Sequence, residues 1–395
     1  MDEIILSVMS PGPEFQPYLL KALQLFEREH KVRVNLQSLS WRSGRSQLIN
    51  FALFRSGPDV SEIDSTWLSN FATIEAIRPF SDQEIERLGG REVFLPVTWS
   101  GCMMHDHLWA VPWTVDVRSV YYRRDLLAKA GVEANQAFHL DRLPATLQAL
   151  RDSGVAQTWF NGVHGSSLVT RLAPWVWAKG GEFISEDGRT PLFMQPEALA
   201  GIHDYFHMQL PFLTPNVYEI ASMDGNALFH AGEIAAIVSG YWTMRTALLG
   251  FSTPQVVDNL GVAPPPGFSY VGGSSLVIWK HSQRAELALT LIEFLTSLRV
   301  QSQFVQTAGL LSPRMTIFES EQFKTDANLR VLRYCLENGR SLPANFLWGL
   351  IEDKLNFVIR TIWRSLFANP TLDLQKVIEQ RFGSLARQIE QNLAE

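Results

Sequence analysis

In the first hundred residues, two patterns of hydrophobic and polar positions alternate along the chain. Apolar residues that alternate with polar ones, or that stand in short blocks, predict strands, and apolar residues three or four apart predict helices. The pattern predicts strands at residues 3–9, 32–36 and 58–65, and helices at residues 15–29 and 45–54. Strands separated by helices predict an α/β domain whose sheet is parallel or mostly parallel, with helices on both faces.

The remainder of the chain continues this mixture and ends in a helical tail. It predicts helices at residues 143–152, 168–178, 195–207, 223–231 and 283–297, and strands at residues 117–122, 234–239 and 276–279. The tail carries a predicted buried stripe at helical spacing, formed by Leu374, Ile378, Leu385 and Ile389. Ser81 and Glu84 form the S-x-x-E pattern of a capping box, which predicts that a helix begins there.

Proline-containing breaks divide the chain. They stand at Pro112, at residues 264–266 and at Pro313. Because proline has a fixed φ angle and no N–H donor, such positions interrupt regular elements. We interpret them as three crossings between two lobes. The expected N-terminal and C-terminal lobes are residues 1–112 plus 268–312 and residues 113–267 plus 313–395, respectively.

Composition narrows the class of protein. The 395 residues are 46% apolar and 19% charged, with a formal net charge of -6. These values predict a globular chain of two domains rather than a disordered one. Lys and Arg are scattered, which argues against a nucleic-acid binder, because such a protein presents a basic face to phosphates. No apolar run approaches the ~18 residues expected of a membrane span.

Neither the start of the chain nor its cysteines decides the cellular compartment. Met1-Asp2-Glu3 runs directly into a predicted strand, whereas a secretory leader has a positive start and then an apolar stretch. The protein is therefore either cytosolic or a mature form whose leader has been removed. Cys102 and Cys335 lie far apart without metal-ligand spacing, and are compatible with one disulfide or with two buried free thiols.

Tryptophan is unusually frequent, with 12 residues beside 24 Phe and 8 Tyr. Many of these indoles adjoin turn residues instead of lying inside apolar periodic runs. An indole has a flat apolar face and one N–H donor at its edge, and pyranose rings have the same mixed character. The alternative is that the rings fill the cores of large lobes. For the set as a whole we favour a cleft in which rings stack on a ligand.

The ends of the predicted strands supply candidate binding residues. Ligands of parallel sheets bind at the carboxyl ends of the strands. Three predicted strand ends therefore place Ser10, Trp41, Asp64 and Trp67 on one rim, and Glu14 at the start of the first helix lies near it. Asp64 can accept hydrogen bonds from two adjacent sugar hydroxyls or cap the helix that follows, and the two roles are compatible.

Five stretches of the chain resemble the motifs of one known protein family. No single stretch is specific, but the five occur in the same order as in that family. They are Gly57-Pro58-Asp59-Val60 with Trp67, residues 109–132, Gly180-Gly181-Glu182, residues 229–242, and residues 261–295 with the Gly272-Gly273 pair. With these stretches the chain resembles the family 1 extracellular solute-binding proteins, the carbohydrate-binding subunits of ABC importers. Its C-terminal part, rich in Trp and Phe, is less like the average relative.

The resemblance implies a type II periplasmic-binding-protein-like fold, in which two discontinuous α/β lobes are joined by a hinge with the ligand cleft between them. It implies a bacterial binder and not an enzyme, without cofactor, metal or nucleic-acid partner. Such a protein captures a sugar or short oligosaccharide by hinge closure and delivers it to the transmembrane subunits of an ABC permease. The implied form is a monomer, periplasmic or lipid-anchored at the cell surface.

The full set of candidate ligand-binding residues stands near predicted strand ends, crossings and glycine turns. It comprises Ser10, Glu14, Trp41, Asp64, Trp67, Trp113, Asp116, Arg118, Trp175, Tyr241, Trp242, Gly272, Gly273, Ser274, Arg314 and Trp348. Trp242 closely follows Gly240, where a backbone can approach a ligand, so we expect Trp242 and Tyr241 to stack on or cover the ligand.

Several of these candidates have a second interpretation. We expect Asp116 and Arg118 to face the cleft from one strand, and the alternative is a surface ion pair of little energetic value. Trp175 and Trp177 cannot share one helix face, and we favour Trp175 for the cleft. The backbone amides of residues 272–274 can bind a hydroxyl, or the segment is an ordinary turn. We expect Arg314, just past Pro313, to reach the cleft from the third crossing.

Other functions remain open on the residues alone. A glycosidase would need two carboxylates across the scissile bond, and Asp64 and Asp116 are a conceivable pair. A same-fold binder of polyamines would need several acids, and one of phosphate esters would need arginines or helix N-termini. Because no cluster of Arg or Lys marks the predicted rim, we expect a neutral ligand. His105 and His107 lack further metal ligands, and the phosphate-binding G-x-x-x-x-G-K-[ST] and hydrolase G-x-S-x-G patterns are absent.

Overall fold

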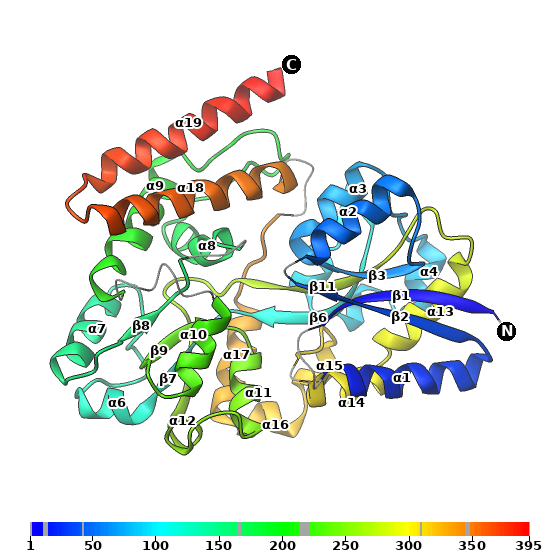
Figure 1. Ribbon diagram of the computed structural model, residues 1–395, viewed down its shortest axis with the longest axis horizontal. Coiled ribbons are helices and arrows are strands. Elements are labelled where there is room, and N and C mark those ends of the chain that lie inside the picture. Colours follow the sequence, from blue (N-terminus) through cyan, green and yellow to red (C-terminus); the bar gives the residue numbers. More distant parts are fainter. Residues whose placement is uncertain are drawn as a thin grey trace. The chain divides into compact units, whose positions relative to one another are not determined.

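The computed structural model describes residues 2–10, 15–41, 43–163, 167–213, 222–308, 310–343 and 348–394. The chain divides into two compact units, each with its own sheet (Figure 1). Unit 1 comprises Met1–Asp116, Val271–Ser320 and Pro343–Gly349, and unit 2 comprises Val117–Tyr270, Glu321–Leu342 and Leu350–Glu395. The sequence had placed the crossings after residues 112, 267 and 312, without a return of the chain at residues 343–349.

Unit 1 begins with the predicted alternation of strands and helices. In chain order it contains β1 (Glu3–Ser10), α1 (Phe15–His30), β2 (Arg33–Ser40), α2 (Gly44–Phe54), β3 (Val60–Asp64), η1 (Ser65–Trp67), α3 (Leu68–Thr73), α4 (Asp82–Arg87), η2 (Arg91–Val93), α5 (Pro96–Ser100), β4 (Met103–Met104), β5 (His107–Leu108), β6 (Val111–Val117), β11 (Val271–Ile278), α13 (Ala285–Thr296), α14 (Leu298–Ala308) and α15 (Met315–Phe318). The predicted strands and helices of the first 64 residues are therefore confirmed.

The main sheet of unit 1 has the strand order β2-β1-β3-β11-β6. β1 runs parallel to β2 and β3, and β11 runs antiparallel to β3, so the sheet is mixed. α2 and α3 lie on one face and α1 and α14 on the other (Figure 1). Leu6 and Ser7 of β1, whose side chains point to opposite faces of the sheet, are both 0% exposed, because helices cover both faces.

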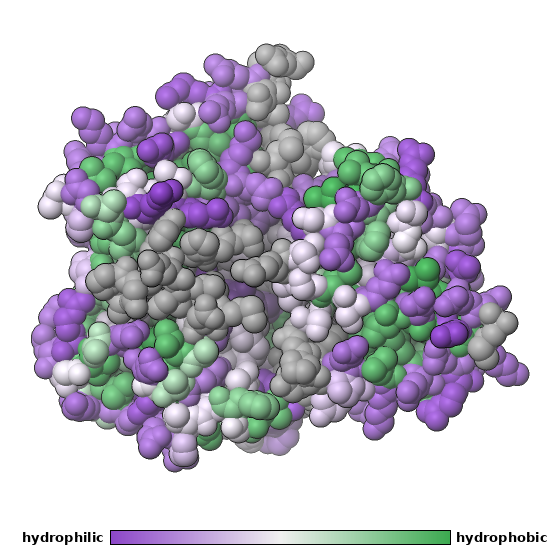
Figure 2. All heavy atoms as spheres, in the orientation of Figure 1, coloured by the Kyte–Doolittle hydropathy of each residue, from purple (hydrophilic) through white to green (hydrophobic). Residues whose placement is uncertain are grey.

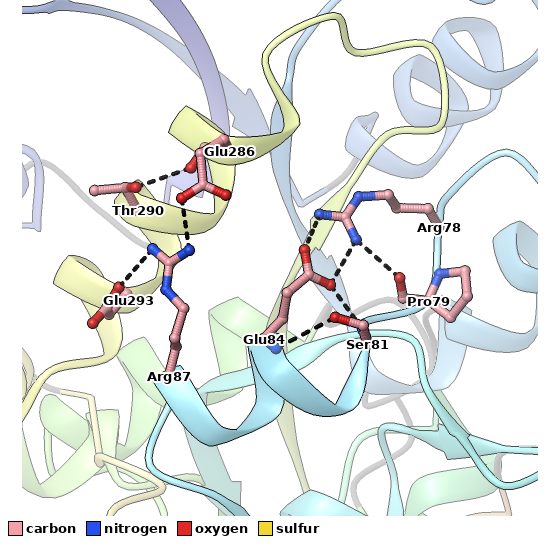
Figure 3. Close-up of polar contacts among 8 residues, drawn as sticks. All are labelled: Arg78, Pro79, Ser81, Glu84, Arg87, Glu286, Thr290 and Glu293. Carbon is pink, nitrogen blue, oxygen red and sulfur yellow. Dashed lines mark hydrogen bonds and ion pairs between the residues drawn. The ribbon is translucent and has the colours of Figure 1, made fainter.

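The capping box predicted at Ser81 begins α4 (Figure 3). The Ser81 hydroxyl accepts a hydrogen bond from the Glu84 amide at 3.4 Å, and the Glu84 carboxylate accepts one from the Ser81 amide at 2.7 Å. Glu84 also pairs with Arg78 at 2.7 Å. At the other end of the helix, Arg87 reaches Glu286 of α13 at 2.6 Å. Caps and ion pairs thus hold a helix that buries none of its own residues.

Replacing Ser81 with alanine should lower the free energy of unfolding by about 1 kcal/mol, because the Glu84 amide loses its acceptor. Arg87→Ala is the matched control on the same helix. Its ion pairs are half exposed, so its loss should be at most about 0.5 kcal/mol. Urea denaturation of the two variants measures both effects, and a Ser81→Ala curve that overlays the wild type would show that the box does not stabilise α4.

Unit 2 carries the remaining elements. In chain order it contains β7 (Ser119–Arg123), α6 (Arg124–Lys129), α7 (Leu143–Asp152), β8 (Trp159–Phe160), α8 (Val169–Ala178), α9 (Pro196–His207), η3 (Leu210–Phe212), α10 (Ser222–His230), β9 (Ala236–Ser239), α11 (Trp242–Leu248), α12 (Pro254–Asn259), β10 (Leu260–Ala263), α16 (Glu321–Thr325), α17 (Ala327–Glu337), α18 (Trp348–Ala368) and α19 (Leu374–Ala394). Its sheet has the order β10-β7-β9-β8.

Helices α8, α9, α18 and α19 build a second layer in unit 2. α9 lies close against α8 because Gly201 has no side chain; a Cβ there would stand 2.5 Å from the Trp175 carbonyl oxygen. On α18, the Trp363 ring packs at 4.8 Å from that of Phe206. The predicted stripe of the tail is confirmed at Ile378 and Leu385, which are buried on α19.

Exposed apolar side chains gather over α2 and α3 of unit 1 (Figure 2). Leu53 and Phe54 are 69% and 75% exposed at the end of α2, and Ile74 is 59% exposed after α3. Contiguous apolar surface of this kind is typical of contacts with other molecules. Within the described ranges, no helix combines the length and apolar character that crossing a membrane requires.

Candidate ligand-binding site

Three strand ends of unit 1 meet at one edge of its sheet, as predicted. Ser10, the last residue of β1, stands opposite Ser40, the last residue of β2, and β3 runs parallel to β1 up to Asp64. Trp41 follows β2 and is 42% exposed, and its ring centroid lies 5.9 Å from that of Trp67. The edge therefore carries a pair of indoles beside a carboxylate.

Asp64 caps the turn that follows its strand. Its Oδ1 accepts hydrogen bonds from the amide and the hydroxyl of Thr66, both at 2.9 Å. The capping interpretation of Asp64 is thus confirmed for the 3-10 turn Ser65–Trp67. Because the carboxylate is only half-buried, contact with a ligand hydroxyl stays a compatible prediction.

The first crossing separates two residues that the sequence had placed on one strand. Asp116 lies in β6 and belongs to unit 1, whereas Arg118 stands between β6 and β7 and belongs to unit 2. The expected single strand over residues 117–122 is therefore wrong at its start. The Arg118 amide donates to the carbonyl of Tyr270 at 2.9 Å. This bond joins the first residues of unit 2 to the last residue before the second crossing.

In unit 2, Arg118 and Trp242 form a stacked pair. The Arg118 guanidinium carbon lies 4.7 Å from the centroid of the Trp242 ring, a geometry that favours cation–π attraction. Trp242 opens α11, and Tyr241 directly precedes it; both are half-buried. Burial raises the pKa of the Tyr241 hydroxyl, so this group stays a neutral donor at neutral pH.

A small hollow in unit 2 adjoins this pair. It is lined by Arg118, Asn161, Thr170, Arg171, Pro174, Trp175, Val238, Pro265 and Pro266. Trp175 contributes to the lining although it is 1% exposed, and its ring meets Tyr205 edge-on at 5.9 Å. Trp177 points elsewhere and lies under the Arg340 guanidinium at 5.1 Å. The preference for Trp175 over Trp177 therefore agrees with the lining of this hollow.

Sequence reasoning missed Asn161 and Arg171. The Arg171 guanidinium donates to Asn161 Oδ1 at 3.3 Å, and Asn161 Nδ2 donates to Gln209 at 3.0 Å. Arg171 could have been found, because it stands four residues before Trp175 on one predicted helix and therefore shares its face. Arg118 and Arg171 line the same hollow of unit 2, a pairing of arginines that the sequence analysis had not predicted.

The glycine pair lies inside a strand, not in a turn or loop. Residues 272–274 belong to β11, and the Ser274 amide donates to Thr114 Oγ1 at 3.3 Å. The Ser274 and Thr114 hydroxyls are 2.7 Å apart. This placement corrects the expectation of loop amides directed at a ligand: Ser274 is 3% exposed and bonds to Thr114.

Three other candidates turn into the protein, and one lies outside the described residues. Trp113 is 0% exposed within the core of unit 1, and Trp348 at the start of α18 is 1% exposed. Arg314 donates from Nε to the Thr296 carbonyl at 2.6 Å within unit 1. We therefore assign these three to packing instead of ligand contact, because their side chains are occupied by neighbouring elements. Glu14 falls in the undescribed segment 11–14.

Comparison with known proteins decides the family. The sequence profile of the family described as "Bacterial extracellular solute-binding protein" matches residues 7–302. The chain belongs to this family. The diacetylchitobiose binding protein DasA of Streptomyces coelicolor is 21% identical over 382 residues, which are 92% of this chain and 85% of DasA.

Solved structures of solute-binding proteins share the fold. An ABC transporter solute-binding protein of Thermotoga lettingae with bound α-D-tagatose superposes with a TM-score of 0.86 at 19% identity, over 100% of both chains. The sugar-binding protein MalE of Xanthomonas citri superposes with a TM-score of 0.82 at 22% identity, over 99% of this chain and 97% of MalE. The predicted type II binding-protein fold with two α/β lobes is confirmed.

The cysteines of this solute-binding protein are free thiols, one in each unit, so the disulfide alternative is wrong. Cys102 lies 3.1 Å from the Ser275 hydroxyl, and burial raises its pKa to about 12. Within the described residues, no three His, Cys, Asp or Glu side chains stand close enough together to hold a metal ion.

Proposed function

We propose that this solute-binding protein captures a sugar or a short oligosaccharide and delivers it to an ABC-type permease. The observation that carries the proposal is the surface of unit 2 formed by Arg118, Trp242 and the adjoining hollow. An indole offers an apolar face to the C–H side of a sugar ring, and guanidinium and amide groups donate to its hydroxyls. The indole pair and Asp64 of unit 1 supply the same two kinds of group.

The relatives support a carbohydrate ligand. DasA is named for diacetylchitobiose, MalE of Xanthomonas citri is described as a sugar-binding protein, and the Thermotoga protein holds tagatose. The same proposal includes capture by hinge closure and transfer to permease subunits. It also includes a monomeric state and a periplasmic or lipid-anchored location. They follow from the role that a family of extracellular solute-binding proteins implies.

A phosphate ester is the second candidate ligand. Arg118 and Arg171 line one hollow, and arginines are the residues that recognise phosphate. The same two cations disfavour a polyamine, which would require carboxylates in their place. A glycosidase would need a pair of carboxylates across the glycosidic bond, and the hollow in the described part of unit 2 is lined by none.

Calorimetric titration tests the proposal. The purified protein is titrated with mono-, di- and trisaccharides, a uronic acid, spermidine and glycerol phosphate. We expect saturable binding of one saccharide class without product formation, at a Kd near 1 μM, which corresponds to about -8 kcal/mol. A response to glycerol phosphate alone would replace the sugar by a phosphate ester, and cleavage of any saccharide would replace the binder by an enzyme.

Asp64→Asn should raise the Kd for that saccharide about fivefold, since a charge-assisted hydrogen bond becomes a neutral one and loses about 1 kcal/mol. Asparagine caps a helix as well as aspartate does, so the fold should keep its stability. Asp326→Asn is the matched control, because Asp326 caps α17 by accepting from the Asn328 amide at 2.8 Å. An unchanged Kd in Asp64→Asn would leave Asp64 with its capping role only.

A further inference from the structure

A buried carboxyl group lies beneath the rim of unit 1. Glu62, in the middle of β3, is 4% exposed. Its Oε2 accepts a hydrogen bond from the Met9 amide of β1 at 2.6 Å. Glutamate is seldom buried to this degree without a cationic partner. A buried glutamate in an interior strand of a sheet therefore indicates a role beyond packing.

Hydroxyl groups extend this contact across the sheet. The Glu62 side chain hydrogen-bonds to the hydroxyl of Ser274 in β11. The Ser274 hydroxyl in turn lies 2.7 Å from that of Thr114 in β6. Together with the Met9 amide, these side chains link β1, β3, β11 and β6 to one another; in the register of β11, Ser274 stands opposite Asp64 and Leu276 opposite Glu62. We call this set the sub-rim network: Met9, Glu62, Ser274 and Thr114.

The sub-rim network lies directly behind the candidate binding carboxylates. Side chains two residues apart on a strand point to the same face. Asp64 therefore follows Glu62 on the same face of β3, one step nearer the edge where the strands end. Asp116 follows Thr114 in the same way on β6. Glu62 and Thr114 thus stand only two residues from these two carboxylates along their strands.

The charge state of Glu62 depends on this setting. Its pKa is raised to about 8: burial raises the pKa most, the hydrogen bonds to Ser274 and Met9 lower it, and the negative charge of Asp64 raises it. Its hydrogen-bonding partners in β1 and β11 are uncharged. Asp116 is the acid facing the same way on β6, and among the described residues no helix places a charge on Glu62. At neutral pH, Glu62 is therefore mostly a neutral acid.

We propose that Glu62 is a positioning residue for Asp64: the neutral carboxyl group holds the strands beneath the rim together, and its ionisation in alkaline solution displaces Asp64 and weakens ligand binding. A second carboxylate charge behind Asp64 repels it and draws water into the network. The proposal rests on the proposed function, because Asp64 is taken to bind the sugar.

Unfolding tests the network without any ligand. The pKa of Glu62 is raised from 4.5 to about 8 by folding. Its contribution to stability is therefore complete below pH 4.5 and is lost as the pH rises through 8. Glu62→Gln keeps the neutral shape and cannot ionise. The Tm of the wild type minus that of Glu62→Gln should fall steadily between pH 5 and pH 9. A difference that stays constant over this range overturns the proposal.

Titration of the saccharide against pH tests the link to binding. The wild-type Kd should rise about tenfold between pH 7 and pH 9.5, a coupling of ordinary size between two sites. The Kd of Glu62→Gln should stay flat, so this variant binds more tightly than the wild type at pH 9.5. The matched control is Glu27→Gln, because Glu27 accepts from the Val34 amide at 2.8 Å in the same unit but away from the rim. It should keep the wild-type profile.

The outcomes separate this proposal from the proposed function. Sugar binding at pH 7 without alkaline loss, or with the same loss in Glu62→Gln, overturns the role of Glu62 and leaves the sugar assignment intact. If the wild type binds none of the saccharides at pH 7, the sugar assignment is overturned, and so is the proposed effect of Glu62 on sugar binding. Alkaline loss in the wild type and in Glu27→Gln, but not in Glu62→Gln, supports the proposal.

Discussion

Replacing Trp242 with alanine is expected to weaken saccharide binding about 30-fold, or about 2 kcal/mol, the size expected when a buried aromatic contact is truncated. The change removes the ring that stacks under the Arg118 guanidinium at 4.7 Å. It therefore removes the apolar face for the ligand and also the surface that holds Arg118 in place. Trp242→Phe keeps a ring and should recover part of the loss.

Phe251→Ala is the matched control for this experiment. Phe251 is an aromatic residue of unit 2 shortly after α11, it is 61% exposed, and it lies outside the lining of the hollow. Calorimetric titration should give this variant the wild-type Kd. An unchanged affinity in Trp242→Ala would mean that Trp242 has a packing role and does not contact the ligand.

Replacing Gly273 with alanine should destabilise unit 1 by about 3 kcal/mol, combining the cost of an unfavourable backbone conformation with that of overpacking. Gly273 has a φ of +136°, and a Cβ there would stand 2.2 Å from the Thr114 carbonyl oxygen. Because β11 lies between β3 and β6, neither neighbour can move away without disturbing the sheet. Urea denaturation followed by tryptophan fluorescence measures the loss.

Gly131→Ala separates the two causes of that loss. Gly131 also has a positive φ, of +68°, but a Cβ there meets nothing within 4 Å. Its replacement should cost about 1 kcal/mol, the backbone component alone. Equal losses in the two variants would mean that the close approach of Thr114 to Gly273 adds nothing, and that the backbone of β11 yields to an extra methyl group.

Local signals in the sequence predicted most elements of the fold. The helix predicted at residues 143–152 is α7, Leu143–Asp152, and the capping box at Ser81 begins α4. The carboxyl ends of β1, β2 and β3 meet at one edge, which is where the sequence placed Ser10, Trp41 and Asp64. Caps and periodic patterns act over a few residues, so they can be recognised without knowledge of distant parts of the chain.

The candidate site was predicted less completely. Tyr241, Trp242, Arg118 and Trp175 come from segments more than a hundred residues apart, yet all four lie in unit 2 and the last two line one hollow. Arg171 and Asn161 were missed because neither follows a predicted strand end or glycine turn; the two-residue strand β8 that Asn161 follows was not predicted. The interpretation of residues 272–274 as a turn was wrong because they belong to β11, in which Ser274 pairs with Asp64 of β3.

The sequence by itself determined the family, the α/β class, the division into two lobes and the edge of the sheet at which unit 1 carries its candidate residues. The class and the sheet edge follow from periodic patterns and caps, which are local, the two lobes from the proline-containing breaks, and the family from the order of five motifs along the chain. Only the tertiary structure decided that Trp113 and Trp348 are buried while Trp41 is exposed, and that Glu62 lies beneath Asp64. The physical reason is that burial and the charge of a carboxyl group depend on neighbours supplied by strands distant in sequence, such as β11 beside β3.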